Sequence, residues 1–421
     1  MDSQGATDSA RRGRALYTKE VELTISNPYW WEGLAAFEAD SLPQSADVVV
    51  AGAGVCGLAA AIELSKCNRS VVLVDARQIG YGASSRNMGL LSGVAKETEA
   101  RLLQLLDDAK ADCDINTGAL LLAPTVRNLR DLAASIPRRK LEYGLDDYVV
   151  TGDQLHEHLG GAADHEFAGA LVMPNATHLH PGKMILALAK YAQSLGVRVC
   201  ENARVLSWEV DSMGLTVDCD GLALRTKQLL LTTGGYTEQL SRPLWKRTLS
   251  IPSTAAVTDE LPAAMIDELF PTRTLAVINR FRGLICRPTP DGRRIVLAGP
   301  VADAPQTTAG DLTNLRTYFQ RLFPMLEGIE FTHCWTGYAG AARDRRTHIG
   351  KQDGAWYSIG ANGLVYSAEA GRLAAGQIVN DQDGSDGEFP AWPLRGHRKL
   401  LWKSIELTAR TLDAMRRSRQ R

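Results

Sequence analysis

The alternation of apolar and polar stretches along the chain predicts an α/β protein. The first apolar segment, residues 46–51, is a β-branched run without helical periodicity, as expected of a buried parallel strand. It leads into a glycine-rich turn at residues 52–57, an Ala- and Leu-rich helix over residues 58–66, and a strand over residues 70–74 that ends on Asp75. Together these segments make a β-α-β unit of about 30 residues.

Further segments continue the pattern. Polar-faced helical sequence predicts helices at residues 97–111, 125–135, 183–195 and 367–379. Apolar runs predict strands at residues 197–200, 203–210 and 228–235, the last of which ends in a glycine turn. Short strands alternate with turns over residues 278–297, with a hairpin turn at Pro290-Asp291-Gly292.

Charge, length and cysteine content exclude several protein classes. The 421 residues include 47 Lys and Arg against 48 Asp and Glu, so the net charge of −1 supplies no global field that attracts nucleic acid. No apolar run approaches the ~18 residues of a transmembrane helix. The seven scattered cysteines form no Cys-x-x-Cys pair, so we expect no disulfide framework, no zinc site and a reducing, cytoplasmic compartment. The polar residues 1–26 lack the apolar core of a secretory signal, and we expect a disordered tail there.

The glycine spacing after the first strand predicts a dinucleotide site. Gly52-x-Gly54-x-x-Gly57 provides a tight turn, close backbone approach to a pyrophosphate and room for the helix to pack on the strand. The helix N-terminus would offer N–H groups and a positive dipole end to the phosphates. Asp75 follows Gly52 by 23 residues, where a carboxylate can accept hydrogen bonds from both ribose hydroxyls. An acid there disfavours NADP and leaves NAD and FAD as alternatives.

The loop after Asp75 favours a flavin. A typical NAD enzyme continues directly into more β-α repeats, whereas this chain continues from Arg77 to Gly89 as a loop of small residues. Small residues let the backbone lie flat against a planar ligand and offer N–H groups to the flavin edge. A plain surface loop would not explain so many small residues beside a buried strand.

Several short sequence blocks follow one another in a specific order: Pro28-Tyr29-Trp30, residues 52–57, 80–89, 180–183 and 231–236, Asp291-Gly292-Arg293, Trp335-Thr336-Gly337, Asp344, His348-Ile349-Gly350 and residues 360–363. This order resembles the FAD-dependent amine oxidoreductases of the D-amino-acid oxidase, glycine oxidase and sarcosine oxidase group. Within the group the chain is most similar to the glutamylputrescine oxidoreductase-like branch, from about Asn27 to Asp413.

The resemblance implies a Rossmann-like FAD-binding domain with an interleaved mixed β-sheet substrate domain. The FAD-binding domain would comprise residues 27–111, 181–245 and 335–380, and the substrate domain residues 112–180 and 246–334. A basic helix would follow within residues 388–421. Its charges could contact a membrane surface or a quinone-bearing partner, but a solvated charged face is the interpretation we favour.

The resemblance also assigns the FAD contacts. Pyrophosphate would lie on the backbone of Gly52, Gly54, Val55, Cys56 and Gly57, and the adenosine ribose on Asp75. The adenine would be bordered by Ala76, Arg77, Val205, Thr233 and Gly234. The isoalloxazine would lie beside Ala83, Ser84, Arg86, Asn87, Met88, Gly89 and Leu90. Positive potential at flavin N1 and C2=O, which favours the anionic reduced form, would come from a helix start at Asn362, Gly363, Leu364 and Val365.

Departures from the branch bear on substrate and acceptor. Met88 and Ser85 replace glycines, and Thr347 stands where proline is usual. Arg343 would bind a substrate carboxylate bidentately if it faces the cavity; the alternative, slightly favoured, is a surface arginine beside Arg345 and Arg346. The sarcosine oxidase branch attaches its flavin through a cysteine, but Gly337 occupies that position and Cys334 is three residues away, so we expect non-covalent FAD.

We expect an enzyme that oxidises the carbon–nitrogen bond of a small amine or amino acid by hydride transfer to flavin N5. The resulting imine would hydrolyse to an aldehyde or keto acid, and oxygen would reoxidise the flavin to give hydrogen peroxide. The oxygen-activating lysine of the sarcosine oxidase branch has no counterpart in residues 281–300 or 352–398, which favours the alternative of a quinone or protein acceptor. A flavin-binding protein without turnover, with Met88 and Arg343 crowding the cavity, is a third hypothesis, and an NAD dehydrogenase is the least favoured.

Two further groups of side chains carry open interpretations. Trp335, Tyr338 and Tyr366 could line an aromatic cage for an ammonium group, although core packing is the commoner fate of such residues. His178 and His180 have the His-x-His spacing of metal ligands but no third ligand pattern, so we favour a structural or helix-capping role and no metal.

Overall fold

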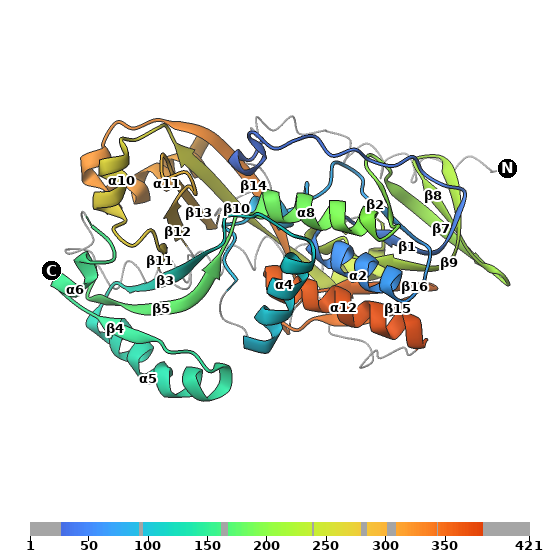
Figure 1. The fold of residues 1–421 in the computed structure, drawn as a ribbon, viewed down its shortest axis with the longest axis horizontal. Helices are drawn as coiled ribbons and strands as arrows, with labels where there is room; N and C mark the ends of the chain where they lie inside the picture. The colour runs from blue at the N-terminus through green and yellow to red at the C-terminus, as the bar shows by residue number, and fades with distance from the viewer. Residues whose placement is uncertain are drawn as a thin grey trace, which may run out of the picture.

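The computed structural model describes residues 27–91, 96–160, 167–237, 240–278, 284–300, 309–342 and 344–381. These residues form two mixed β-sheets of eight strands each, which lie next to each other along the long axis of the molecule (Figure 1). We call the sheet that contains β1 sheet A and the other sheet B. The expected α/β class, with a Rossmann-like sheet and a second mixed sheet, is confirmed.

Sheet A is built around parallel strands in the order β6-β2-β1-β9-β16. Their bounds are β1 Ser45–Ala51, β2 Val71–Val74, β6 Arg198–Cys200, β9 Leu222–Leu231 and β16 Ala355–Ile359. An antiparallel edge strand, β15 (His348–Gln352), pairs with β16. Strands β7 (Val205–Asp211) and β8 (Gly214–Cys219) form an antiparallel meander with β9.

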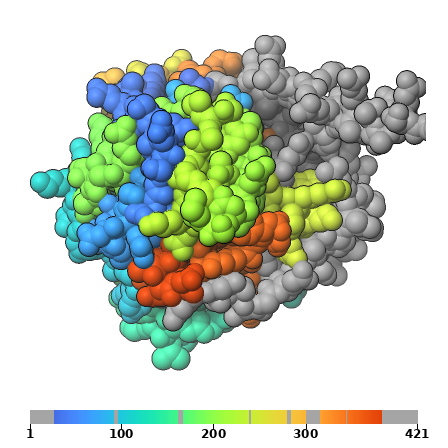
Figure 2. All heavy atoms as spheres, turned by 90° about the vertical axis from the view of Figure 1, so that its right-hand side faces the viewer, coloured from blue at the N-terminus to red at the C-terminus, as the bar shows by residue number. Residues whose placement is uncertain are grey.

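The strands of sheet A are buried on both sides, and different elements cover the two faces. Val48 and Val50 face a helical layer of α2 (Val55–Lys66), α4 (Lys96–Asp108), α8 (Pro181–Ser194) and α12 (Leu364–Asn380). Val49 and Ala51 face the meander. Figure 2 shows this end of the molecule, with the yellow-green meander beside the blue lead-in to β1 and above the red α12.

Sheet B has the strand order β14-β10-β13-β12-β11-β3-β5-β4, and only its β11–β3 pair is parallel among the described residues. The bounds are β3 Asn116–Ala123, β4 Tyr148–Val150, β5 Gly169–His178, β10 Thr248–Thr258, β11 Leu275–Ile278, β12 Leu284–Pro288, β13 Ile295–Pro300 and β14 Phe331–Ala342.

One face of sheet B packs against α10 (Ala263–Leu269) and α11 (Ala309–Leu322). The other, which we call the inner face, packs against α5 (Val126–Tyr143) and against Trp30 and Met88. The remaining short elements are η1 Tyr29–Trp31, α3 Ala83–Arg86, α6 Asp153–His156, η2 Gly234–Tyr236, α9 Arg242–Arg247 and η3 Pro324–Leu326.

The sheets are joined at two places, the loop of residues 89–91 and the short helix η2. At the first place two backbone hydrogen bonds are made. The N–H of Leu91 donates to the carbonyl of Thr177 on β5 (2.8 Å), and the N–H of Leu179 donates to the carbonyl of Gly89 (3.1 Å). At the other contact, η2 lies so close to β14 that a Cβ on Gly235 would be 2.5 Å from the carbonyl oxygen of Tyr338. The loop expected to lie beside the flavin is therefore fixed directly to sheet B.

Several predicted helices differ in extent from those of the structure. α4 ends at Asp108 rather than residue 111, and α8 begins at Pro181 rather than residue 183. α2 begins at Val55 rather than residue 58, and α12 at Leu364 rather than residue 367, because the glycine-rich turns end sooner and Gly57 itself lies in α2. α5 continues through Pro137 to Tyr143. The predicted tail at residues 1–26 and basic helix within 388–421 lie outside the described residues. No helix in the described ranges is long and apolar enough to cross a membrane.

Candidate functional site

The glycine-rich turn between β1 and α2 has no room for side chains. Gly52 has a φ of +114°, and a Cβ there would lie 2.9 Å from the carbonyl oxygen of Thr232. A Cβ on Gly57 would lie 1.9 Å from the carbonyl oxygen of Gly52, because α2 packs directly on the turn. A Cβ on Gly54 would meet the Ser84 hydroxyl at 2.9 Å. Gly52 and Gly57 are therefore required by contact with backbone, whereas the neighbour of Gly54 is a side chain that can shift.

The first turn of α2 is available to an anion. Its N-cap, Gly54, makes no side-chain capping bond, and the turn has no acidic residue. The N–H of Val55 donates to Ser84 Oγ (3.0 Å), which ties α3 to this helix start. Burial raises the pKa of Cys56 to about 11, so its thiol stays neutral and contributes no competing charge. N–H groups at a helix start bind phosphate through hydrogen bonds and the helix dipole.

Asp75 lies at the end of β2, next to the same turn. Its Oδ2 accepts a hydrogen bond from the N–H of Ala53 (2.8 Å) and its Oδ1 from the N–H of Arg77 (2.9 Å). Burial raises the pKa of the carboxyl to about 6 despite these two bonds. The carbonyl of Asp75 accepts from the N–H of Ala203 (2.8 Å), which places the start of β7, at Val205, close to the carboxylate.

A second uncapped helix start lies at the same edge of sheet A. α12 follows β16, as α2 follows β1, and carboxyl ends of parallel strands share one edge of a sheet. Its N-cap, Gly363, has a φ of +95° and makes no side-chain capping bond. A Cβ on Gly371 of α12 would be 2.1 Å from the Cys56 carbonyl oxygen, so the two helices are in backbone contact. Thr233 and Gly234 follow β9 at this edge, which we call the nucleotide edge.

The loop of residues 83–90, which we call the flavin loop because it is predicted to lie beside the isoalloxazine, is held in one conformation by its own side chains. The Asn87 amide donates to the carbonyls of Ala83 and Ser84 (2.8 Å each), and its Oδ1 accepts from the N–H of Gly89 (2.7 Å). Gly89 has a φ of +75°, and a Cβ there would lie 1.9 Å from the carbonyl oxygen of Leu179. The loop can therefore present its backbone to a ligand in one arrangement.

Comparison with known proteins places this arrangement in a family. The sequence profile of the DAO family, described as FAD dependent oxidoreductase, matches residues 47–377. The chain belongs to the DAO family. It is an FAD-dependent oxidoreductase, and the resemblance inferred from the sequence blocks is confirmed.

Relatives of this DAO-family chain match most of its length. It is 25% identical over 420 residues to gamma-glutamylputrescine oxidoreductase of Escherichia coli, covering 91% of this chain and 95% of the relative. It is 23% identical over 371 residues to the probable oxidoreductase OrdL of Haemophilus influenzae, covering 81% and 84%.

Solved structures share the fold. An L-amino acid deaminase from Proteus vulgaris matches with a TM-score of 0.69 at 20% identity, covering 86% of this chain and 97% of that one. A glycine oxidase from Bacillus cereus matches with a TM-score of 0.68 at 18% identity, covering 83% and 100%.

The nucleotide edge fits FAD on its own geometry. The glycines let the backbone itself approach a pyrophosphate, and neither N-cap residue, Gly54 or Gly363, carries a side chain. Ser84 Oγ accepts one N–H of the α2 start, that of Val55. Asp75 has two oxygens that can accept ribose hydroxyls in addition to its backbone donors. These are the residues that would hold the dinucleotide.

Arg86, one of the predicted flavin contacts, packs against aromatic rings. Arg86 is 7% exposed, and its guanidinium carbon lies 4.7 Å from the ring centre of Tyr81 and 5.0 Å from that of Trp31. Its Nε donates to the Tyr81 carbonyl (2.7 Å) and its Nη1 to the Thr336 carbonyl (3.3 Å). Burial lowers its pKa. Arg86 therefore joins the flavin loop to β14.

The predicted substrate residues lie in different surroundings. Trp335 is fully buried and donates its indole N–H to the Arg86 carbonyl (3.1 Å), and Met88 is 4% exposed in the same apolar cluster. Tyr338 packs edge-on against Tyr236 with ring centres 5.6 Å apart. Tyr366 is 46% exposed in the first turn of α12. Arg343 lies outside the described residues.

Sequence reasoning missed a buried cationic cluster beside Met88. Arg287 is 1% exposed and lies 4.9 Å from the ring centre of Trp30. Its Nη1 contacts His178 Nδ1 (2.7 Å) and its Nη2 donates to the Leu179 carbonyl (2.9 Å). No carboxylate forms an ion pair with it in the part of the chain that the structure describes. These residues are distant in sequence, and only the Trp30 and His178 blocks gave any signal.

Hydrogen-bond chemistry fixes the histidine tautomer in this cluster. Arginine has no acceptor, so His178 Nδ1 accepts and Nε2 carries the proton. Burial and the neighbouring Arg287 charge lower the pKa of His178 to about 3. The nearby His180 caps α8 by accepting the N–H of Lys183 (3.1 Å), which confirms the predicted capping role. Burial lowers the pKa of His180 to about 4.

Proposed function

We propose that this DAO-family protein oxidises the carbon–nitrogen bond of an amine or amino acid to an imine, which water hydrolyses to an aldehyde or keto acid. The observation that carries the proposal is that the loop of residues 83–91 joins two regions. Its Ser84 bonds the start of α2 at the nucleotide edge, and its residues 89–91 bond β5 and Leu179 beside the apolar inner face of sheet B. The substrate class is supported by the relatives, one of which is a gamma-glutamylputrescine oxidoreductase and another a glycine oxidase.

FAD, when bound, would supply a two-electron acceptor that takes a hydride from the carbon next to the nitrogen. The chain would hold it through the amides of residues 52–57, the Asp75 carboxylate and the α12 N-terminus. Non-covalent attachment is supported by Gly337, which stands where the sarcosine oxidase branch has its attachment cysteine. A Cβ at this position would lie 2.9 Å from Arg86 Cβ, so a cysteine side chain has no room there.

Two buried guanidinium groups favour the reactive, neutral form of an amine. Arg86 belongs to the flavin loop, and Arg287 bonds the carbonyl of Leu179, whose N–H bonds Gly89 of that loop. Neither arginine forms an ion pair with a carboxylate within the described residues. A positive potential lowers the pKa of a nearby amine, so it binds without its extra proton and needs no dedicated general base. The apolar side chains of Met88 and Trp335 exclude water from the same region.

The electron acceptor would be oxygen or, alternatively, a quinone or protein. The second acceptor class is supported by the sequence, which has no lysine in residues 281–300 or 352–398. The neighbouring Lys351 pairs with Asp381 (2.9 Å) and lies 4.4 Å from the ring centre of Trp356, at the edge of sheet A.

Product analysis tests the proposal. The holoprotein is incubated with monoamines, diamines and amino acids, under air and, in parallel, under nitrogen with a soluble quinone. We expect an aldehyde or keto acid, with ammonia or a shorter amine, from one compound class. Faster product formation with the quinone than with air would identify a dehydrogenase. No product from any class with either acceptor would overturn the proposal.

A further inference from the structure

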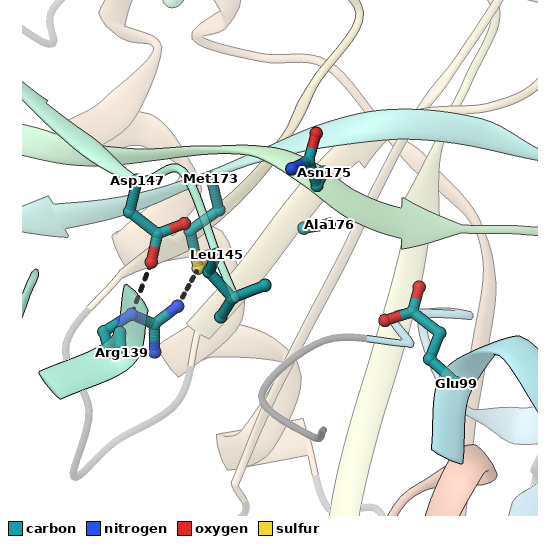
Figure 3. A pocket seen from close by; sticks show the side chains of 7 residues that line it. All are labelled: Glu99, Arg139, Leu145, Asp147, Met173, Asn175 and Ala176. Carbon is teal, nitrogen blue, oxygen red and sulfur yellow. Dashed lines mark hydrogen bonds and ion pairs between the residues drawn. The ribbon is translucent and has the colours of Figure 1, made fainter. Parts of the chain in front are cut away.

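A small hollow opens between α4, α5 and β5, on the inner face of sheet B (Figure 3). Its volume is about 10 Å³, room for one water-sized group, and it is partly open to solvent. The side chains that decide its chemistry are Glu99 from α4, Arg139 from α5, Asp147 before β4, and Met173 and Asn175 from β5.

The arginine in this hollow is already neutralised. Arg139 Nε donates to Asp147 Oδ2, and the two side chains are only 11% and 3% exposed. The Arg139 Nη2 donates to the thioether sulfur of Met173 (3.3 Å). Because a buried Arg–Asp pair carries no net charge, the hollow takes its charge from its remaining ionisable residue, Glu99.

Glu99 lies across the hollow from Asn175 and points its carboxylate toward it (Figure 3). The carboxylate accepts a hydrogen bond from the Thr177 side chain, and no cation forms an ion pair with it in the described ranges. Partial burial raises its pKa, as expected of a carboxylate without a cationic partner. The Glu99 carboxylate matches the donors of an ammonium group, and Asn175, at the rim of the same hollow, adds no charge that would compete with it.

The hollow adjoins the flavin loop. The carbonyl of Thr177, whose side chain contacts Glu99, accepts the N–H of Leu91 (2.8 Å). Met173 and Ala176, which line the hollow, belong to the same apolar cluster as Met88. A ligand that reaches the flavin loop along this face of β5 could therefore place a distant group in the hollow.

We propose that the hollow of Glu99 and Asn175 binds a protonated amine, the non-reacting ammonium group of a substrate that carries two nitrogens. This inference rests on the proposed function. It separates two chemical environments: buried arginines beside the flavin loop favour a neutral amine, and the Glu99 carboxylate favours a charged one. A metal ion is a poorer occupant, because no group of three His, Cys, Asp or Glu side chains that could hold one is found where the structure is described.

The experiment compares a diamine with the monoamine of the same length. The holoprotein is titrated anaerobically with 1,4-diaminobutane and with butylamine, and the apparent Kd is read from the flavin spectrum and by calorimetry. Glu99→Gln keeps the size of the side chain and removes its charge. The matched control is Glu97→Gln, since Glu97 is exposed on the same helix. Asn175→Lys places a positive charge in the hollow from an exposed position.

We expect Glu99→Gln to weaken binding of the diamine about tenfold, the effect of one charge-assisted hydrogen bond, and to leave butylamine unchanged. Asn175→Lys should weaken the diamine at least as much, and Glu97→Gln should change neither. Equal effects on both amines, or no effect of Glu99→Gln and Asn175→Lys, would overturn the assignment. If no amine bleaches the flavin, the proposed function fails, whereas calorimetric binding that depends on Glu99 would still support the ammonium site.

Discussion

The nucleotide edge of sheet A and the inner face of sheet B are built from different materials. The nucleotide edge consists of backbone amides, glycines and one carboxylate, and most of it lies within two short segments of sequence. The inner face consists of side chains brought together from η1, β5, β12 and β14. A site made from backbone is determined by steric exclusion, whereas a site made from side chains depends on which residues the fold places together.

The largest expected effect comes from the backbone-built side. Gly57→Ala would place a methyl group 1.9 Å from the Gly52 carbonyl oxygen, and we expect it to lower the unfolding free energy by about 3 kcal/mol or more. Denaturant unfolding and FAD content measure the result. Gly376→Ala, in open space on α12, is the matched control and should raise stability by about 0.5–1 kcal/mol. Equal behaviour of both variants would contradict the steric account.

On the side-chain-built face, the largest effect is expected at Arg287. Arg287→Met removes the charge but leaves His178 Nδ1 and the Leu179 carbonyl without their donor, and should destabilise by about 2–4 kcal/mol. Thermal and denaturant unfolding measure it. Arg316→Met is the comparison, because its ion pair with Glu330 is exposed and should contribute less than about 1 kcal/mol. A loss at Arg287 as small as that at Arg316 would mean that the buried cluster is not a structural link.

Asp75 tests the nucleotide edge through binding rather than folding. Asp75→Ala removes the acceptor expected for the ribose and should weaken FAD binding about 10- to 100-fold, as loss of a charge-assisted hydrogen bond would. Reconstitution of the apoprotein with FAD, followed by fluorescence, gives the Kd. Asp47→Ala serves as control, since Asp47 is bonded to Ser70 and Lys227 at the opposite end of β1. Unchanged FAD affinity in Asp75→Ala would remove this carboxylate from the site.

The pH dependence of stability distinguishes the same two regions. The folded pKa values of His178 (about 3) and His180 (about 4) lie below the unfolded value of about 6.5, so stability falls as pH drops below about 6.5. Asp75 in the apoprotein acts oppositely, because its folded pKa of about 6 is raised and its contribution is lost as pH rises through 4 to 6. His178→Gln should reduce the acid loss by at most about 1.4 kcal/mol per pH unit. A slope unchanged from wild type in denaturant melts would contradict a neutral His178.

The smallest effect is expected at Tyr366, which is half exposed on α12. Tyr366→Ala should change stability by less than about 0.5 kcal/mol. If its ring helps to hold an ammonium group, amine affinity should fall about 2- to 5-fold, the effect of one exposed cation–π contact. Titration of the flavin spectrum with amine measures this, and unchanged affinity would remove Tyr366 from the predicted aromatic cage.

Local signals predicted what is local in the structure. The glycine spacing and Asp75 predicted a tight turn between strand and helix with a carboxylate at the end of the next strand, and the structure has both. These signals are local, because Gly57 contacts Gly52 and Asp75 bonds the N–H of Ala53. The predicted helices α2 and α12 began late, since glycine-rich turns leave no periodic signal in the first turn. Arg287 was missed because a lone arginine in a strand has no pattern, and its partners His178 and Trp30 lie more than a hundred residues away.

The anaerobic visible spectrum of the purified holoprotein, before and after addition of one equivalent of amine, tests the central claim most directly. The account predicts that one class of amine or amino acid bleaches the flavin spectrum. It also predicts that the flavin is released from the protein on denaturation, as expected of a non-covalent cofactor. A flavin that no amine bleaches would contradict amine oxidation, and a protein that binds no FAD even after reconstitution would contradict the assignment of the nucleotide edge itself.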